Sequence, residues 1–215
     1  MTYRAAIFDL DGTILNTLDD LADSLNAALV YLKLPALELE TVRQMIGHGL
    51  NNLIETACDG RCPVEILKVN FKNEYRQRQL NKTVPYPGIR NLFERLADRR
   101  WALGVLSNKD HENTKTIVEH YFPGAFQIVQ GALPDLPLKP DPAAVIEMVK
   151  NLEAAPRETI YVGDSAVDIL TAKNANLTPL GAAWGFRTKT ELIEAGAAAV
   201  FDRPIDILEY IGYVR

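Results

Sequence analysis

The chain has 215 residues, of which 47% are hydrophobic and 24% are charged, and its net charge at pH 7 is −5. This length suffices for one large domain or for a domain with an insertion, and the composition is ordinary for a soluble globular protein. The negative net charge argues against a broad nucleic-acid-binding surface. No apolar run approaches the length of a membrane span, so we expect no membrane association.

The first apolar run reaches Asp9 within a few residues, so the N-terminus lacks the three-part pattern of a signal peptide. Cys58 and Cys62 are the only cysteines, and no second cluster of Cys or His completes a zinc site with them. We therefore expect reduced structural thiols in a cytoplasmic protein.

The first expected element is a buried strand. The apolar run Ala5–Phe8 is too short for a helix and suits a strand that is covered on both faces. It is followed by Asp9 and Asp11, and then by Gly12, which permits a sharp turn. Carboxylates at the end of a buried strand are costly unless something pairs with them, and a divalent cation is the obvious partner. A capped turn with two solvated acids is the alternative.

A helical block follows this strand. Apolar residues recur at helical spacing from Leu18 to Leu32, and Pro35 ends the pattern. Further helices are expected near residues 39–46, 50–57 and 64–75, and no strand is expected between residues 16 and 82. The outer faces of this block are too polar for it to form the main core.

From Tyr86 onward the predicted elements alternate. Helices are expected at 89–99, about 112–121, 143–151, after Asp164 and near 190–195, and strands at 102–106, 126–129, 159–162, 179–182 and 198–201. Such alternation indicates a parallel sheet with helices on both faces. We therefore predict an α/β fold: a Rossmann-like doubly wound core formed by residues 1–15 and 84–215, with residues 16–83 inserted as a helical cap.

Residues with useful chemistry follow four successive predicted strands. Ligands of an open parallel sheet bind outside the carboxyl ends of its strands. The residues found there are, in chain order, Asp9, Asp11 and Thr13; Ser107, Asn108 and Lys109; Lys139; and Asp164 and Asp168. Together they provide the charges needed for a metal ion and a phosphate.

Each of these residues also has an ordinary structural interpretation. Ser107 and Asn108 could cap a helix, Lys139 could be a solvated lysine, and Asp164 and Asp168 could cap or solvate a helix. Asp141, followed by Pro142, is expected to cap the helix that begins there. The functional interpretation is favoured because the residues fall in order at four successive strand ends.

These residues resemble the motifs of the haloacid dehalogenase superfamily of phosphohydrolases. The segment 9–13 (DLDGT) is similar to the first motif, Ser107 to the second, Lys139 to the third, and Gly163–Asp164 with Asp168 to the fourth. Within the superfamily the chain is most similar to phosphoglycolate phosphatases, on the basis of segments 47–49 (GHG), 107–109 (SNK) and 183–186 (AWGF). One departure is Asn16, where relatives often have an aspartate.

The resemblance implies roles for these residues. Asp9 would be the nucleophile that forms an aspartyl-phosphate, and Asp11 the general acid and base. Mg²⁺ would be held by the side chains of Asp9 and Asp164 and by the backbone carbonyl of Asp11, with Asp168 behind them or on a metal-bound water. The expected phosphate-binding residues are Thr13, Ser107, Asn108 and Lys139. His48 and Lys109 are expected to set substrate specificity, with a surface turn and packing at the rim as their respective alternatives.

The implied substrate is a small phosphorylated metabolite, with 2-phosphoglycolate as the best match, hydrolysed by a monomer or a homodimer. A sugar-phosphate phosphatase and a β-phosphoglucomutase-like phosphomutase remain open alternatives. Relatives that cleave carbon–halogen or carbon–phosphorus bonds usually lack Asp11, which argues against those reactions. A phospho-accepting switch like a response-regulator receiver carries a similar set of acids, hydroxyl and lysine, but the inserted cap and Asp11 argue against it.

Overall fold

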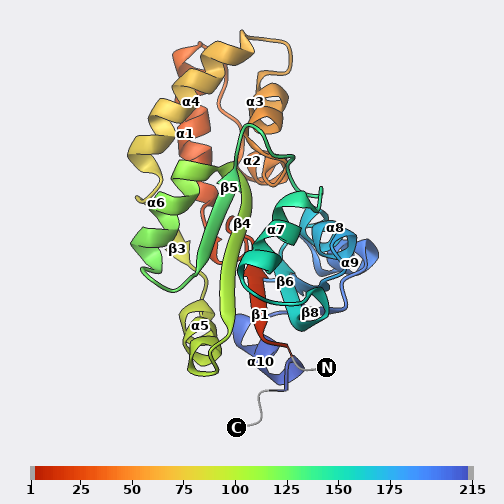
Figure 1. The fold of residues 1–215 in the computed structure, drawn as a ribbon. Helices are drawn as coiled ribbons and strands as arrows, with labels where there is room; N and C mark the ends of the chain where they lie inside the picture. Colours follow the sequence, from red (N-terminus) through yellow and green to blue (C-terminus); the bar gives the residue numbers. More distant parts are fainter. Residues whose placement is uncertain (1–2, 213–215) are drawn as a thin grey trace.

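The computed structural model describes residues 3–212, and within them six strands pair in parallel to form one sheet in the order β5–β4–β1–β6–β7–β8 (Figure 1). The strands are β1 (Ala5–Phe8), β4 (Ala102–Asp110), β5 (Ile128–Ala132), β6 (Thr159–Gly163), β7 (Thr178–Ala182) and β8 (Ala199–Phe201). The predicted doubly wound parallel sheet is thereby confirmed.

Strand β1 lies where the strand order reverses. The chain adds β4 and β5 on one side of β1 and then crosses to add β6, β7 and β8 on the other side. All four residues of β1 are fully buried. Ala6 and Phe8 belong to one hydrophobic core and Ile7 to another, because alternate side chains of a strand point to opposite faces of the sheet. The crevice expected at such a reversal therefore opens directly beyond Phe8.

Helices cover both faces of the sheet (Figure 1). The core around Phe8 includes residues of α5 (Ile89–Asp98), α6 (His111–Tyr121) and α10 (Ile207–Tyr210). The core around Ile7 includes residues of α7 (Ala143–Asn151) and α8 (Ala166–Asn174). Helix α9 (Lys189–Ala195) contacts β7 and β8, and short 3₁₀ helices span Pro156–Glu158 and Pro204–Asp206.

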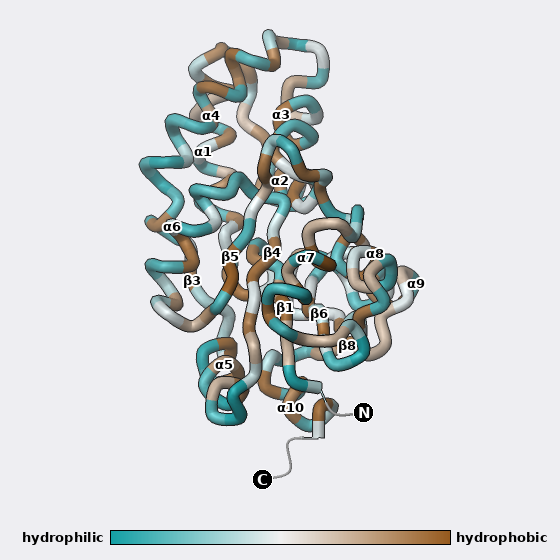
Figure 2. The backbone as a smooth tube through the Cα atoms, in the orientation of Figure 1, coloured by the Kyte–Doolittle hydropathy of each residue, from teal (hydrophilic) through white to brown (hydrophobic). Residues whose placement is uncertain are grey.

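The predicted helical block forms helices α1 to α4, which lie together at the end of the molecule remote from both termini (Figure 1). They are α1 (Leu18–Tyr31), α2 (Leu39–Met45), α3 (Leu50–Cys58) and α4 (Val64–Arg78). Hydrophobic and hydrophilic residues alternate along them in Figure 2, as expected for helices with one buried face. Among the described residues, no helix is both long and apolar enough to cross a membrane.

A short ribbon that the sequence did not predict joins the helical block to the sheet. Strands β2 (Leu15–Asn16) and β3 (Val84–Pro85) pair antiparallel, and each is too short to produce a periodic pattern. Nearby, the buried carboxylate of Asp20 accepts hydrogen bonds from the backbone N–H groups of Lys82 and Thr83 and from the Thr83 hydroxyl. The two chain passages thus lie side by side next to the proposed boundaries at residues 16 and 83. The division into core and cap remains our interpretation of this arrangement.

Two predicted strands have different limits in the structure. Strand β4 continues from Leu106 to Asp110, because its pairing with β5 resumes after an irregularity beyond the apolar run. Ser107, Asn108 and Lys109 therefore belong to the strand and do not follow it. Strand β5 covers residues 128–132, whereas the sequence predicted 126–129. The Asp141 carboxylate accepts a hydrogen bond from the Ala143 N–H at the start of α7, in agreement with its expected structural role.

Candidate active site

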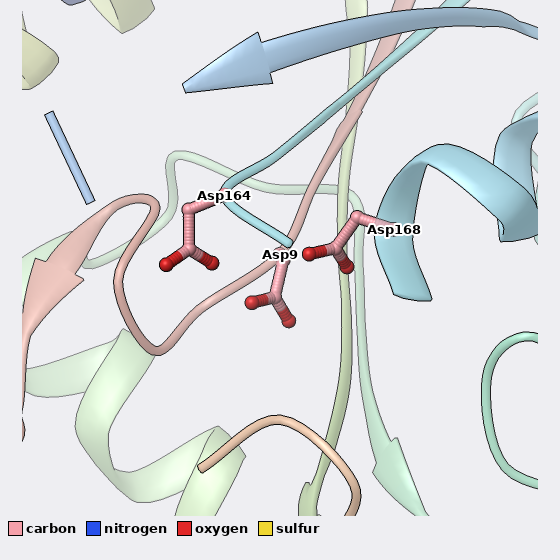
Figure 3. A group of neighbouring side chains, drawn as sticks. All are labelled: Asp9, Asp164 and Asp168. Carbon is pink, nitrogen blue, oxygen red and sulfur yellow. The ribbon is translucent and has the colours of Figure 1, made fainter. Parts of the chain in front are cut away.

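Three buried carboxylates meet at the carboxyl end of the central strands. Asp9 follows β1, Asp164 follows β6, and Asp168 lies in the first turn of α8. Oxygen atoms of the three side chains lie within 4.8 Å of one another. Figure 3 shows the Asp9 carboxylate between those of Asp164 and Asp168. The neighbouring positions of β1 and β6 in the sheet bring these residues together across more than 150 positions in sequence.

Lys139 provides the positive charge for this cluster. Its ammonium Nζ lies 2.6 Å from Asp9 Oδ1, 2.7 Å from Asp168 Oδ1 and 3.2 Å from the Leu106 carbonyl oxygen. Burial alone would lower the pKa of Lys139, but the carboxylates of Asp168 and Asp9 outweigh it and raise this pKa well above its ordinary value. Lys139 is therefore a fixed cation at the floor of the site.

One cation does not neutralise three acids, and the remaining carboxylates resist ionisation. Burial raises the pKa of Asp9 to about 7; Lys139 opposes this shift and the charge of Asp168 adds to it. Burial and the charges of Asp168 and Asp9 raise the pKa of Asp164 well above its ordinary range. The cluster thus has an excess of negative charge that protons or a cation must balance.

The three carboxylates differ in how strongly their oxygens are already engaged. Asp168 uses both, since Oδ1 faces Lys139 and Oδ2 accepts hydrogen bonds from the Ser165 backbone N–H and hydroxyl. Asp164 Oδ2 accepts a bond from the Phe186 N–H at 2.7 Å, and its Oδ1 accepts a long bond of 3.4 Å from the Thr13 hydroxyl. Among the described residues, no donor is bonded to Asp9 Oδ2. Asp9 and Asp164 are therefore the side chains best placed to share a hard cation, which prefers oxygen ligands.

Glycines surround Asp164 because no side chain would fit there. A Cβ atom added to Gly12 would lie 2.2 Å from Asp164 Oδ2, and one added to Gly185 would lie 2.3 Å from Asp164 Cβ. Gly12 also has a φ of +87°, which a residue with a side chain rarely adopts. These glycines, with the Phe186 N–H, fix the Asp164 carboxylate toward Asp9.

Asp11, two residues after Asp9, also lines the cleft. Its carboxylate accepts a hydrogen bond of 2.6 Å from the Thr17 hydroxyl and lies 2.8 and 3.0 Å from Lys109 Nζ. Both Asp11 and Lys109 line the cleft. Burial alone would lower the pKa of Lys109, but Asp11 raises it above its ordinary value, so the lysine stays charged.

The expected phosphate-binding residues divide into two groups. Ser107 and Lys139 line the cleft next to Asp9. Thr13 is fully buried, does not line the cleft, and directs its hydroxyl toward Asp164 at 3.4 Å. The Asn108 side chain lines the cleft but is occupied by backbone groups: it donates to the carbonyls of Gly47 and Lys139 and accepts from the Lys139 N–H. Asn108 therefore links the GHG segment to the Lys139 loop.

The two residues expected to set specificity also differ. The Lys109 side chain is buried and lines the cleft, as expected for a residue that contacts a substrate. His48 is exposed and is not among the lining residues, whereas its neighbours Gly47 and Gly49 are. The structure thus favours the surface-turn interpretation of His48, because the backbone of the GHG segment, and not its imidazole, faces the site.

The cleft itself lies between the carboxyl end of the sheet and the helical block, where α1, α3, α4 and the segment 46–49 line it. Tyr75 of α4 and Arg187, which follows β7, also line it, and the sequence did not single out either residue. A tyrosine at a core position of an amphipathic helix carries no local signal of a binding role, and neither does an arginine in a loop.

Comparison with known proteins agrees with these motifs. The model of the family described as haloacid dehalogenase-like hydrolase matches residues 6–182. This chain belongs to the haloacid dehalogenase-like hydrolase family. The expected superfamily and the expectation of a hydrolytic enzyme are thereby confirmed.

Two curated relatives of similar length are both named phosphoglycolate phosphatase. The phosphoglycolate phosphatase of Psychrobacter arcticus is 29% identical over 223 residues, which cover 98% of this chain and 96% of that protein. The phosphoglycolate phosphatase of Aquifex aeolicus is 31% identical over 184 residues, which cover 85% and 86% of the two chains.

Solved structures show how widely the fold is shared. A Lactobacillus delbrueckii protein provisionally named a phosphoglycolate phosphatase has a TM-score of 0.91 at 32% identity and covers 98% of this chain and 99% of its own. A Thermotoga maritima protein provisionally named a β-phosphoglucomutase has a TM-score of 0.80 at 20% identity, and the match covers 99% of this chain and 100% of that protein. The second likeness shows a common fold alone, so the fold does not distinguish a phosphatase from a mutase.

Proposed function

We propose that the protein is a Mg²⁺-dependent phosphomonoester hydrolase that acts through an aspartyl-phosphate and that its substrate is 2-phosphoglycolate. The observation that carries the reaction is the position of Asp9, a buried carboxylate at the end of the central strand with one oxygen 2.6 Å from Lys139 and the other without a donor among the described residues. The substrate is supported by the shared name of the curated relatives.

The free oxygen of Asp9 suits a nucleophile. Its attack on phosphorus would break the bond to the leaving oxygen and leave the phosphoryl group on Asp9. Uncatalysed hydrolysis of phosphate monoesters is so slow that catalysis must remove about 20 kcal/mol or more of the barrier. Lys139 and the Ser107 hydroxyl, which line the cleft beside Asp9, would stabilise the charge on the transferring group.

Asp11 would be in reach of the leaving oxygen, which is the end of the scissile P–O bond remote from Asp9. In the first step it would give a proton to the leaving alkoxide, and in the second it would take a proton from the water that attacks the aspartyl-phosphate. Thr17 and Lys109 would hold its carboxylate toward the cleft through the hydrogen bonds described above.

The residues that would hold Mg²⁺ are Asp9, Asp164 and the backbone carbonyl of Asp11, which together form a set of oxygen donors. When bound, the ion would reduce the repulsion between the Asp9 carboxylate and the phosphoryl group. Asp168 would keep Lys139 in place, given its contact of 2.7 Å. Cytoplasmic location and a monomeric or homodimeric state remain predictions.

A panel of small phosphate esters with Mg²⁺ tests this proposal. We expect phosphate release to be fastest, in terms of kcat/KM, from 2-phosphoglycolate, and Asp9→Asn to lower it by at least about 1000-fold without loss of the fold. Isomerised sugar phosphate without released phosphate would instead indicate a phosphomutase, and preference for a sugar phosphate would indicate a sugar-phosphate phosphatase. An Asp9→Asn variant that remains active, with labelled phosphate on another residue, would contradict the assignment of the nucleophile.

A further inference from the structure

The cleft has a second polar region, formed where a core strand meets a helix of the predicted cap. Lys109 reaches it from β4 and Tyr75 from α4, and both side chains are almost fully buried. Lys109 Nζ lies 4.7 Å from the centroid of the Tyr75 ring. Asp11, the proposed acid–base residue, accepts a hydrogen bond from the same ammonium group, so this region adjoins the position that the leaving oxygen would take.

Lys109 is the buried cation of the cleft that is available to a leaving group. Four cationic side chains line the cleft among the described residues, namely Lys72, Lys109, Lys139 and Arg187. Lys139 is held by Asp9 and Asp168, and Arg187 donates to three backbone carbonyls. Lys72 is 43% exposed at the rim. An ammonium group has three N–H donors; two of those of Lys109 can serve the two Asp11 oxygens, which leaves one for a further acceptor.

The Tyr75 hydroxyl is a buried donor that lacks an acceptor. Tyr75 is 2% exposed, and within residues 3–212 no acceptor is bonded to its hydroxyl; the neighbouring Lys109 ammonium can only donate to it. Burial raises the pKa of Tyr75 to about 12, so the hydroxyl keeps its proton at neutral pH. Leaving a buried hydroxyl unpaired costs free energy, and an acceptor brought into the cleft by a ligand would remove that cost.

The remaining wall contributed by the predicted cap is apolar. Its lining side chains are those of Leu21, Ile46, Leu50, Leu53 and Phe71, with backbone from Gly47 and Gly49. Among the described residues of helices α1 to α4, Lys72 and Tyr75 are the polar side chains that line the cleft. A sugar has many hydroxyls that need partners, and such a wall would leave most of them unpaired.

We propose that Lys109 and Tyr75 form the leaving-group subsite and bind a carboxylate carried by a short phosphorylated hydroxy acid. The ammonium would supply the charge and the hydroxyl a directed hydrogen bond to the same carboxylate. This inference rests on the proposed phosphatase function and explains how the site would prefer 2-phosphoglycolate to a neutral ester.

The test compares 2-phosphoglycolate with phosphoglycolamide, in which a neutral amide of similar shape replaces the carboxylate. The ratio of the two kcat/KM values cancels effects that act on both substrates alike, including any effect through Asp11. We expect Tyr75→Phe to lower this ratio by about tenfold or more, and Lys109→Met to lower it further. Tyr121→Phe is the control, because its hydroxyl bonds to the Thr83 carbonyl at 2.6 Å and does not line the cleft.

Thermal unfolding gives a second readout. Tyr75→Phe removes a hydroxyl that has no acceptor among the described residues and should lower Tm less than Tyr121→Phe, which removes a hydroxyl bonded to a carbonyl. A wild-type preference for the carboxylate that survives in both cleft variants would overturn the subsite and leave the proposed function intact. Equal rates on the two substrates in the wild type would overturn both the subsite and the 2-phosphoglycolate assignment. Failure to release phosphate from any ester, including an aryl phosphate, would overturn the phosphatase proposal and this inference with it.

Discussion

Asp164 and Asp168 carry the same side chain in one cluster, but their surroundings give them different expected roles. Both oxygens of Asp168 are engaged, by Lys139 on one side and by Ser165 on the other. Within the described part of the chain Asp164 has no ammonium partner: it is oriented by a short hydrogen bond from the Phe186 N–H and a long one from the Thr13 hydroxyl, and its oxygens retain acceptor capacity toward Asp9. At the residue scale, therefore, Asp164 suits direct metal binding and Asp168 suits the positioning of Lys139.

Isosteric substitutions separate the two roles. We expect Asp164→Asn to weaken Mg²⁺ binding by about 100-fold or more, because it removes a charged ligand. Asp168→Asn should change Mg²⁺ affinity only a few-fold but lower kcat by about 10–100-fold, because Lys139 loses an anchoring charge. Calorimetric Mg²⁺ titration together with steady-state kinetics measures both effects. Equal losses of Mg²⁺ affinity in the two variants would show that Asp168 is also a ligand.

Helix α2 and the loop after β7 hold each other through reciprocal hydrogen bonds. The Arg187 guanidinium donates to the carbonyls of Arg43, Gln44 and Ile46 at the C-terminal end of α2, at 2.9, 3.0 and 2.8 Å. Arg43 Nε donates in return to the Phe186 carbonyl at 2.8 Å, and the Phe186 N–H bonds to Asp164. A cation at the end of α2 also interacts favourably with the helix dipole. At the scale of elements, this contact holds the predicted cap next to a proposed metal ligand.

Removing the Arg187 side chain should loosen this contact, so that the predicted cap lies against the site in a smaller fraction of molecules. The apparent affinity for the substrate falls in proportion to the fraction of molecules that are in the binding-competent arrangement. We therefore expect Arg187→Ala to raise KM by about tenfold and to change kcat less. Arg203→Ala is a matched control, because Arg203 is exposed and pairs only locally with Asp206 among the described residues. A large fall in kcat with unchanged KM would argue that Arg187 acts on the chemical step and not on the position of the predicted cap.

For the whole molecule, the excess of buried acids makes stability depend on pH and on the metal ion. The folded pKa of Asp9 is about 7 and its ordinary value is 3.8. Between these values the folded state binds more protons than the unfolded state, so the stability of the metal-free protein falls as pH rises. For Asp9 alone the full loss is on the order of 4 kcal/mol, and Asp164 shifts in the same direction. Mg²⁺ would balance the negative charge of the Asp9 and Asp164 carboxylates in place of protons.

Thermal unfolding with Mg²⁺ or with a chelator, at pH 5.5 and pH 8, checks this linkage. We expect Mg²⁺ to raise Tm by several degrees more at pH 8 than at pH 5.5, because protons compete for the carboxylates at the lower pH. The metal-free protein should unfold at a lower temperature at pH 8. An increase in Tm that is independent of pH would mean that the cluster does not take up protons when the metal is removed.

Local patterns in the sequence were sufficient to predict the parallel sheet, the helical block after the first strand and the cluster of carboxylates. Burial on both faces makes Ala5–Phe8 continuously apolar, and helices α1 to α4 have their own apolar spacing, so each element carries its signal within a few residues. The rule that parallel strands present their carboxyl ends at one edge then brings Asp9, Lys139, Asp164 and Asp168 together without further information. The limits of β4 were missed because pairing with β5 continues after the apolar pattern has ended.

Only the tertiary structure decided which side chains line the cleft. Lys109 meets Asp11 across 98 positions, Arg187 meets Ile46 across 141, and Asn108 meets Gly47 across 61. Tyr75 and His48 illustrate the reason. In the sequence, Tyr75 looks like an ordinary core residue of a helix and His48 looks like a substrate-binding residue between two glycines. In the structure, Tyr75 is buried and lines the cleft, whereas His48 is exposed and does not. The direction of a side chain at such a junction depends on how two packed elements meet, and no local periodicity encodes that geometry.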